Sequence, residues 1–197
     1  GEVASRMVVA AVHDMVNSGE EIDAAALQSA VLRANQRVLD ASAENPSYEG
    51  MGSTATVLHI DEKDGLAYYA HVGDSRLYLL RRGIFQQVSR DHSYVEELVA
   101  RGELSEAEAQ HHPRKNLLLR AVGIEESLHV DGDSFSIEDG DRLLLATDGL
   151  TNMVEDAALA ALLGSRFEGV ADRMVEQALA EGGRDNVTAI ALAYQAS

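Results

Sequence analysis

The stretch GDRLLLATDGLTN, at residues 140–152, gives the clearest indication of the fold. Gly140 and Asp141 are typical of a turn, and the apolar run that follows is typical of a buried β-strand. Asp148 and Gly149 come directly after that run. The aspartate either starts another turn, since Asp and Gly are common turn residues, or is held at the strand end to bind a ligand. The stretch alone leaves both alternatives open.

Further strand-like segments lie before and after this stretch. They are short and rich in β-branched, aromatic and other apolar residues: 53–60, 66–72, 76–80, 84–88, near 128–137, 142–146 and 187–194. Turn residues separate the first four, which is the pattern of an antiparallel meander.

Helical spacing of apolar residues appears at both ends of the chain and between the strands. The expected helices are 2–17, a segment from the cap residue Asp23 to a point before Pro46, 93–111, 156–163 and 168–180. Ser105 and Glu108 have the spacing of a capping box. Helices that bracket runs of mostly antiparallel strands predict an α+β fold, with sheets in the middle and helices packed outside.

The composition narrows the classes of function. The chain has 197 residues, of which 33 are acidic and 16 basic, so its formal charge is −17. This balance argues against a nucleic-acid binder and against a binder of anionic membranes, which need basic surfaces. The absence of Cys excludes disulfides, thiolate catalysis and Cys-ligated zinc. There is no apolar run long enough for a membrane helix and no visible secretory signal, so we expect a cytoplasmic protein.

Three aspartates stand at expected strand ends near glycine: Asp74 in HVGDSR, Asp148 in ATDGL and Asp185 in GGRDNVT. Each one alone is a typical turn residue, with glycine supplying a positive φ. If the three turns meet at one edge of the sheets, their carboxylates repel one another unless cations neutralise them. Ligand sets made only of oxygen favour Mg²⁺ or Mn²⁺. The residues therefore predict a candidate site for hard divalent cations, without indicating a reaction.

Seven motifs carry a more specific signal because they occur in a fixed order. They are GEVAS (1–5), GMGSTATV (50–57), AHVGDSRLYLLRRG (70–83), VSRDHSYVEELVARGELS (88–105), NLLLRAVG (116–123), GDRLLLATDGLTN (140–152) and GGRDNVTAIAL (182–192). This series resembles that of the bacterial metal-dependent protein phosphatases of the PPM family (type 2C). The resemblance covers essentially the whole chain.

The resemblance implies one phosphatase domain over 1–197 with an αββα sandwich of two mainly antiparallel sheets. It also implies hydrolysis of phosphoserine and phosphothreonine in proteins by a water activated at a centre of two or three Mn²⁺ or Mg²⁺ ions. By position in the motifs, Asp148 and Asp185 should bind the first metal, and Asp148 should also approach a third. Asp74 should bind that weaker third metal. Residues 89–116 resemble the family's flap beside the site.

His92, in the motif RDHS, is a candidate for proton transfer because histidine titrates near neutral pH. The alternative is a structural role in the flap. The family implies phosphorylated proteins as substrates, and a Ser/Thr kinase is a candidate partner. No protein nucleophile is needed, which agrees with the absence of Cys.

The sequence departs from the family pattern at its beginning. In the family, an Arg-containing segment and an Asp-Gly-Met-Gly-Gly turn precede the GEVAS-like motif, and this sequence starts at Gly1 of that motif. The resemblance therefore implies that the first strands, the metal-bridging aspartate and the phosphate-holding arginine are not among these 197 residues. An inactive pseudophosphatase, acting as a regulatory phosphoprotein-binding module, is the alternative function. A sheet edge without its neighbouring strands also favours dimerisation or strand exchange.

Overall fold

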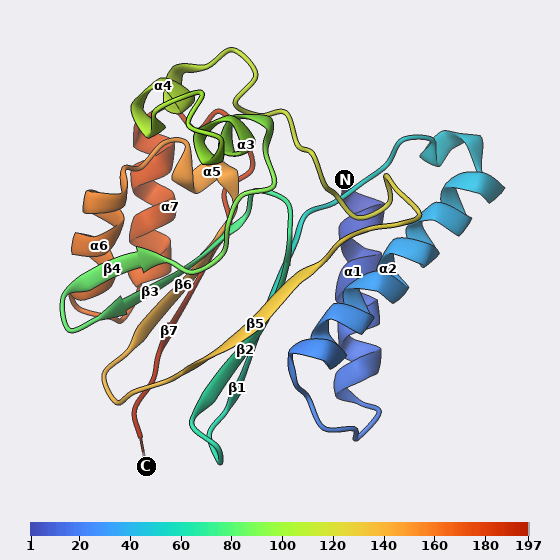
Figure 1. Cartoon of the computed structure of the whole chain (residues 1–197). Helices are drawn as coiled ribbons and strands as arrows, with labels where there is room; N and C mark the ends of the chain where they lie inside the picture. The colour runs from blue at the N-terminus through green and yellow to red at the C-terminus, as the bar shows by residue number, and fades with distance from the viewer. Residues whose placement is uncertain (197) are drawn as a thin grey trace. The chain divides into compact units, whose positions relative to one another are not determined.

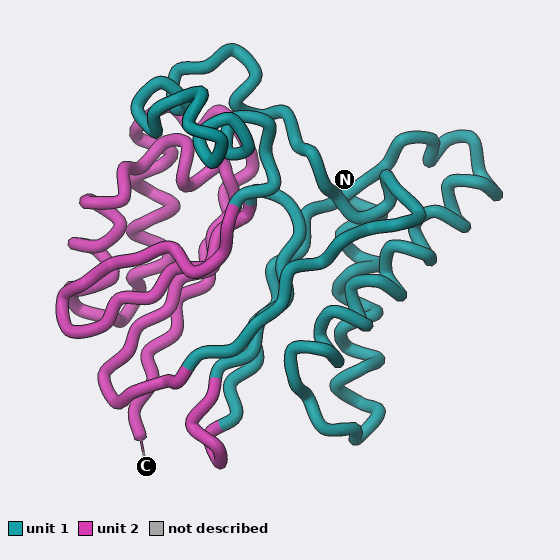
Figure 2. Tube along the Cα trace, viewed as in Figure 1, with its two compact units in different colours: residues 1–61, 67–74, 91–135 teal, residues 62–66, 75–90, 136–197 magenta. Residues whose placement is uncertain are grey.

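The computed structural model describes residues 1–196, which form two compact units (Figure 1, Figure 2). Unit 1 comprises residues 1–61, 67–74 and 91–135. Unit 2 comprises residues 62–66, 75–90 and the chain from 136 to the end of the described part.

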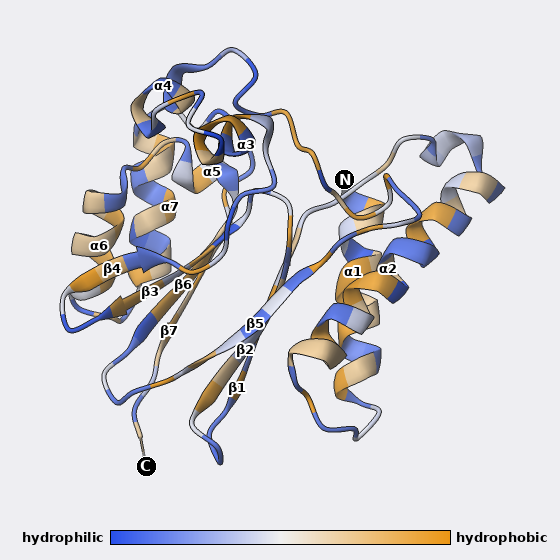
Figure 3. Ribbon diagram, viewed as in Figure 1, coloured by the Kyte–Doolittle hydropathy of each residue, from blue (hydrophilic) through white to orange (hydrophobic). Residues whose placement is uncertain are grey.

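Unit 1 is built around a three-stranded sheet in the order β1-β2-β5. Its strands are β1 (Ala55–Asp61), β2 (Leu66–Val72) and β5 (Asp131–Ser136). Its helices are α1 (Glu2–Val16), α2 (Ala24–Glu44), the short 3-10 helix η1 (Pro46–Tyr48), α3 (Tyr94–Ala100) and α4 (Glu106–His111). Helices α1 and α2 pack against each other, and their buried faces share one hydrophobic core with residues of the sheet. Both helices show hydrophobic and hydrophilic patches in Figure 3, as expected of helices with one buried face.

The local signals in unit 1 act as the sequence predicts, with one difference. Asp23 caps α2, because its Oδ1 accepts the backbone N–H of Ala26 at 2.7 Å. Ser105 and Glu108 form the expected capping box at the start of α4. The segment 93–111, which the sequence suggested to be helical throughout, is divided into α3 and α4. Gly102, with φ of +72°, lies between them, and a residue with positive φ commonly ends a helix.

Unit 2 contains a four-stranded sheet in the order β4-β3-β6-β7, with antiparallel neighbours throughout. Its strands are β3 (Arg76–Arg81), β4 (Ile84–Gln87), β6 (Arg142–Ala146) and β7 (Ala189–Ala193). Its helices are α5 (Asp148–Thr151), α6 (Asp156–Gly164) and α7 (Val170–Ala180). The core of the unit combines one face of the sheet, including Tyr78 and Leu144, with buried residues of all three helices.

The expected meander of the first four strands is wrong. Strands β1 and β2 lie in one sheet, whereas β3 and β4 lie in the other. The reason is visible in β3, where four consecutive residues, Leu77 to Leu80, are buried. Such a run is typical of a strand inside a sheet, and β3 lies between β4 and β6.

The α+β class is confirmed, since each unit packs helices against a sheet of its own. Within residues 1–196, none of the helices combines the length and the apolar character needed to cross a membrane.

Candidate metal centre

Strand β6 positions Asp148. It is a central strand, with Ala146 opposite Arg76 of β3 on one side and opposite Ala189 of β7 on the other. Thr147 follows the strand as the N-cap of α5, and Asp148 is the first residue of that helix. The carboxylate is thus anchored by a strand that is paired on both edges, which gives it a defined position.

The chain around Thr147 is joined to the segment that precedes β7. The N–H of Thr147 donates to the carbonyl of Thr188 at 3.1 Å, and the N–H of Thr188 donates to Thr147 Oγ1 at 3.0 Å. Thr147 Oγ1 in turn donates to the carbonyl of Asn186 at 3.3 Å. These three bonds hold residues 186–188 beside the start of α5.

Gly149 allows the same two segments to approach closely. A Cβ atom at this position would overlap the backbone carbonyl of Asn186. We predicted that the glycine beside each aspartate supplies a positive φ, and for Gly149 this is wrong, because the residue is helical. Its small size is what matters here. Gly73, beside Asp74, does have a positive φ, of +110°.

The approach of the two segments brings Asp148 and Asp185 within electrostatic range. Burial raises the pKa of the Asp148 carboxyl, and the negative charge of Asp185 raises it further. The N–H of Gly149 and the positive charge of Arg76 act in the opposite direction on this pKa, but they do not cancel the increase. The ionised form of Asp148 is therefore disfavoured, which is the condition that a bound cation would relieve.

The donor set of this pair fits a hard divalent cation, because it consists of carboxylate oxygens. Asp148 is half-buried and Asp185 is exposed, so solvent reaches the pair. Among the described residues of either unit, no three His, Asp or Glu side chains form a group that could hold a metal ion. The pair would thus supply only part of a coordination shell, which suits Mg²⁺ and its usual retention of several waters.

Asp74 belongs to unit 1, where it follows β2 after Gly73. A Cβ atom on Gly73 would lie 2.6 Å from Cβ of Thr54, and the φ of Gly73 is +110°. Both observations show that the turn before Asp74 requires glycine.

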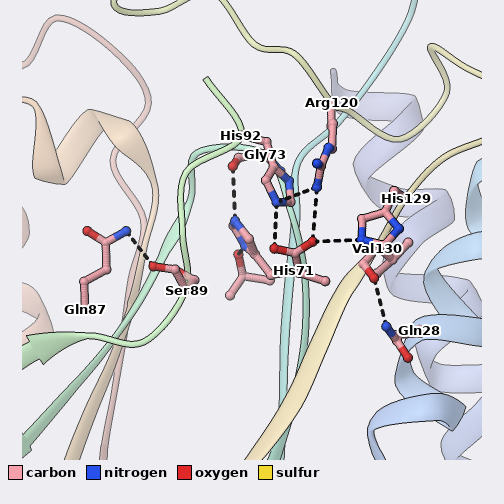
Figure 4. A network of polar contacts seen from close by, with 11 residues as sticks. Gln28, His71, Gly73, Gln87, Ser89, His92, Arg120, His129 and Val130 are labelled. Atoms are coloured by element: carbon pink, nitrogen blue, oxygen red, sulfur yellow. Dashed lines mark hydrogen bonds and ion pairs between the residues drawn. The ribbon is translucent and has the colours of Figure 1, made fainter. Parts of the chain in front are cut away.

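His92 lies against this turn, and both of its ring nitrogens have partners (Figure 4). The N–H of Gly73 donates to His92 Nδ1 at 3.1 Å, and His92 Nε2 lies 3.1 Å from Oδ2 of Asp131. Arg120 Nη1 donates to Oδ1 of the same carboxylate at 3.1 Å. Burial lowers the pKa of His92, although the hydrogen bond and the charge of Asp131 act to raise it.

The structure thus brings together two of the predicted site residues, Asp148 and Asp185, in unit 2. It places Asp74 and His92 around one turn in unit 1. Sequence reasoning missed Thr147 and Asp131, which connect to these residues. The only signal for Thr147 was its place before Asp148. Asp131 had none, because its contact with His92 joins two distant parts of the sequence.

The comparisons with known proteins agree with this arrangement. A family model described as "Protein phosphatase 2C" matches residues 1–184. The chain is 36% identical over 198 residues to "Serine/threonine phosphatase stp" of Listeria innocua, covering 96% of this chain and 77% of that protein. It is 39% identical over 148 residues to "Protein phosphatase PhpP" of Streptococcus pneumoniae, covering 74% of this chain and 59% of that protein.

Solved structures give the same result. The serine/threonine phosphatase PstP/Ppp of Mycobacterium tuberculosis matches with a TM-score of 0.89 and 34% identity, covering 100% of this chain and 83% of that one. The catalytic domain of PstP in complex with two manganese ions matches with a TM-score of 0.87 and 34% identity, covering 99% of this chain and 82% of that one. The chain belongs to the protein phosphatase 2C family.

Proposed function

We propose that this chain is a metal-dependent protein phosphatase that hydrolyses phosphoserine and phosphothreonine in other proteins. The observation that carries the proposal is the close approach of the segments of Asp148 and Asp185 in a chain of the protein phosphatase 2C family. Burial, and then the charge of Asp185, raise the pKa of Asp148 there. Relatives named serine/threonine phosphatases support the reaction, and the two manganese ions bound to PstP support the cofactor. No observation favours the inactive alternative.

The roles proposed for the carboxylates are those that the resemblance of their motifs to the family implies. Asp148 and Asp185 would hold one ion jointly, and Asp74 would hold a further, weaker ion. Divalent cations bound by carboxylates of this kind supply activation of water and stabilisation of the charge that develops on the phosphoryl group. The protein's own contribution is to keep the carboxylates in place through β6, through the bonds of Thr147 and through the turn at Gly73.

The first experiment is a Mn²⁺ titration of the purified chain, with hydrolysis of p-nitrophenyl phosphate and of a phosphothreonine peptide as readouts. We expect hydrolysis to increase with Mn²⁺ and to be lost in Asp148→Asn. Asp172→Asn is the matched control, since it removes an exposed carboxylate in the first turn of α7 of the same unit. Equal hydrolysis by the wild type and Asp148→Asn would contradict the proposed site. A wild type that binds Mn²⁺ and the phosphopeptide without hydrolysing it would favour the regulatory module instead.

The proposal extends to the partner and the cellular location of the enzyme. A phosphoprotein substrate requires a kinase that phosphorylates Ser or Thr, so such a kinase is the proposed functional partner. The cytoplasm is the proposed location of the protein. The interpretation of 1–197 as a single domain, with 89–116 as its flap, stays a prediction.

Dimerisation or strand exchange also stays a prediction. Strand β7 is an edge strand of its sheet, and Ile190 in it is 55% exposed. Edge strands of this kind offer unpaired backbone groups to a second chain. Light scattering across a range of protein concentrations will test this, with Ile190→Lys expected to remove any dimer that forms through β7.

A further inference from the structure

We propose that His92 is a positioning residue whose imidazole ring fixes the turn of Gly73 and Asp74, and so holds Asp74 in place as a metal ligand. The role of Asp74 rests on the proposed function. The geometry itself lies within unit 1 and can be tested without metal.

The peptide groups of Gly73 are held from both sides. Its N–H donates to His92 Nδ1 at 3.1 Å. Its carbonyl accepts the backbone N–H of His92 at 2.7 Å, and His71 Nε2 lies 3.1 Å from the same oxygen (Figure 4). The three residues are buried, so water does not replace these bonds readily. The direction in which the chain enters Asp74 is fixed as a result.

Asp131 determines which nitrogen of His92 carries the proton. A backbone N–H can only donate, so the N–H of Gly73 requires a lone pair on His92 Nδ1. The neutral ring then has its proton on Nε2, which faces Oδ2 of Asp131 at 3.1 Å. The opposite tautomer would place two donors against each other at Gly73 and a lone pair against a carboxylate. Asp131 therefore acts on the turn through His92.

Arg120 and His129 hold Asp131 in turn. Arg120 Nη1 donates to Oδ1 of Asp131 at 3.1 Å, and His129 Nε2 lies 3.5 Å from the same oxygen. Arg120 Nη1 also lies 3.2 Å from His92 Nε2. Both of these nitrogens carry hydrogen, so their closeness reflects a shared acceptor. The Asp131 carboxylate thus lies against side chains from three segments of unit 1.

The same contacts argue against proton transfer by His92. The residue is only 7% exposed, and each ring nitrogen already has a partner. Donating a proton to a substrate would require the Nε2 proton to leave Asp131, and accepting one at Nδ1 would break the bond from Gly73. Positioning is the role that leaves the observed contacts in place.

Two substitutions separate the functions of the two ring nitrogens. In His92→Asn, the amide oxygen can take the place of Nδ1 and accept the N–H of Gly73, while the link to Asp131 is lost. In His92→Gln, the longer amide can reach Asp131, while no acceptor remains for Gly73. The pair is matched in polarity and in being uncharged, so a general effect of removing the histidine would change both variants alike.

The metal-free readout is amide hydrogen exchange of Gly73, measured by NMR in the presence of chelator. We expect protection in the wild type and in His92→Asn, and exchange about 10-fold faster or more in His92→Gln, because a buried N–H loses its acceptor. The second readout is Mn²⁺ binding, followed by electron paramagnetic resonance. His92→Gln should weaken binding of the lower-affinity ion, the one proposed for Asp74, by about 10-fold, as is typical for outer-shell changes. His92→Asn should bind this ion like the wild type.

Equal exchange of the Gly73 amide in the wild type and both variants would overturn the inference. Exchange that is as fast in His92→Asn as in His92→Gln would also overturn it, because the effect would then come from loss of the ring as a whole. Unchanged Mn²⁺ affinity in His92→Gln, despite faster exchange, would show that the turn does not position Asp74 and would overturn it as well. A wild type that binds no second ion would instead contradict the role of Asp74 in the proposed function, and amide exchange would still decide whether His92 fixes the turn.

Discussion

The two ends of strand β6 carry aspartates that look alike in the sequence and differ in their surroundings. Asp141 precedes the strand and is 1% exposed. Arg81 donates to both of its oxygens, from Nε at 2.8 Å and from Nη2 at 2.6 Å, and the N–H of Glu138 donates to Oδ2 at 2.8 Å. At Asp148, after the strand, burial raises the pKa of the carboxyl, and the negative charge of Asp185 raises it further.

The difference shows what separates a structural carboxylate from a functional one in this protein. Both aspartates stand beside glycine at the end of the same apolar run. A bidentate arginine neutralises Asp141, so this end of the sheet has no electrostatic need for a ligand. At Asp148 the burial and the neighbouring charge are only partly compensated, and a divalent cation would compensate the remainder. Neighbouring charge, more than sequence pattern, distinguishes the two ends.

The largest expected effect is on activity. Asp148→Asn should reduce Mn²⁺-dependent hydrolysis by about 10²–10³-fold, the scale for losing one charge-stabilising group at a reacting centre. Asp141→Asn, assayed at a temperature where it stays folded, should change the rate by no more than a few-fold. Initial rates at saturating Mn²⁺ will check this. A comparable loss of rate in both variants would mean that the two ends do not differ in function.

The next effect concerns stability, and here the substitution of Asp141 should cost more than that of Asp148. Asp141→Asn should lower the free energy of unfolding by about 3 kcal/mol, because it leaves the Arg81 guanidinium without its main partner. For a chain of this size the Tm should fall by about 6–12 °C. Thermal unfolding followed by circular dichroism measures it. If Asp141→Asn lowered the free energy of unfolding only as much as the loss of an exposed ion pair does, solvent would already screen the charge of Arg81.

A smaller effect is expected at the contact between Gly149 and the backbone of Asn186. Gly149→Ala should destabilise the protein by about 1–3 kcal/mol, because its Cβ would overlap the carbonyl of Asn186. Gly164→Ala is the matched control, since its Cβ would lie at an ordinary 3.6 Å from Leu80 Cδ2. Urea denaturation of the two variants provides the measurement. Equal stability would mean that the segment at Asn186 moves away at little cost.

The smallest effect is a gain in stability. Folding raises the pKa of Asp148 above its ordinary value of 3.8, so the native state binds the proton more tightly than the unfolded chain does. The stability from this group is present at low pH and is lost as pH increases through the folded pKa. In chelator at pH 7, Asp148→Asn should therefore raise the free energy of unfolding by about 0.5 kcal/mol, the scale of partly exposed charges.

The pH dependence provides the control for that gain. The advantage of Asp148→Asn should shrink when unfolding is measured at pH 3, where the wild-type carboxyl is protonated in both states. Addition of Mn²⁺ should reverse the order of the two proteins, because the ion stabilises only the form that binds it. A variant that is less stable than the wild type in chelator would show that the Asn152–Asp148 contact at 3.4 Å outweighs the repulsion.

Much of this arrangement could be predicted from the sequence, because it depends on short-range pattern. The apolar run of β6 and the cap at Asp23 are local signals, and the structure has both. The division of the first four strands between two sheets was not predictable in this way. Strand β3 pairs with Leu143–Leu145 of β6, which lie more than 60 residues away along the chain, and local pattern does not indicate such a partner.

The candidate site shows the same limit. Its acidic residues were recognisable from Asp and Gly at strand ends. The reason for Gly149 was not, because it depends on a backbone contact with Asn186 that forms only on folding. The contact between the side chains of His92 and Asp131 likewise joins residues that are 39 positions apart along the chain. Properties that depend on such distant pairs need the three-dimensional structure.

The ion pair of Arg81 and Asp141 has a consequence for how this protein can vary in evolution. It fixes one end of β6. The position of the Asp148 carboxylate at the other end then depends on the number of residues between Asp141 and Asp148. Replacing one apolar residue of β6 by another leaves that count unchanged. Inserting or deleting a single residue would turn the following side chains to the opposite face and carry Asp148 away from Asp185. Between Asp141 and Asp148, we therefore expect natural variants to differ more often in apolar composition than in length.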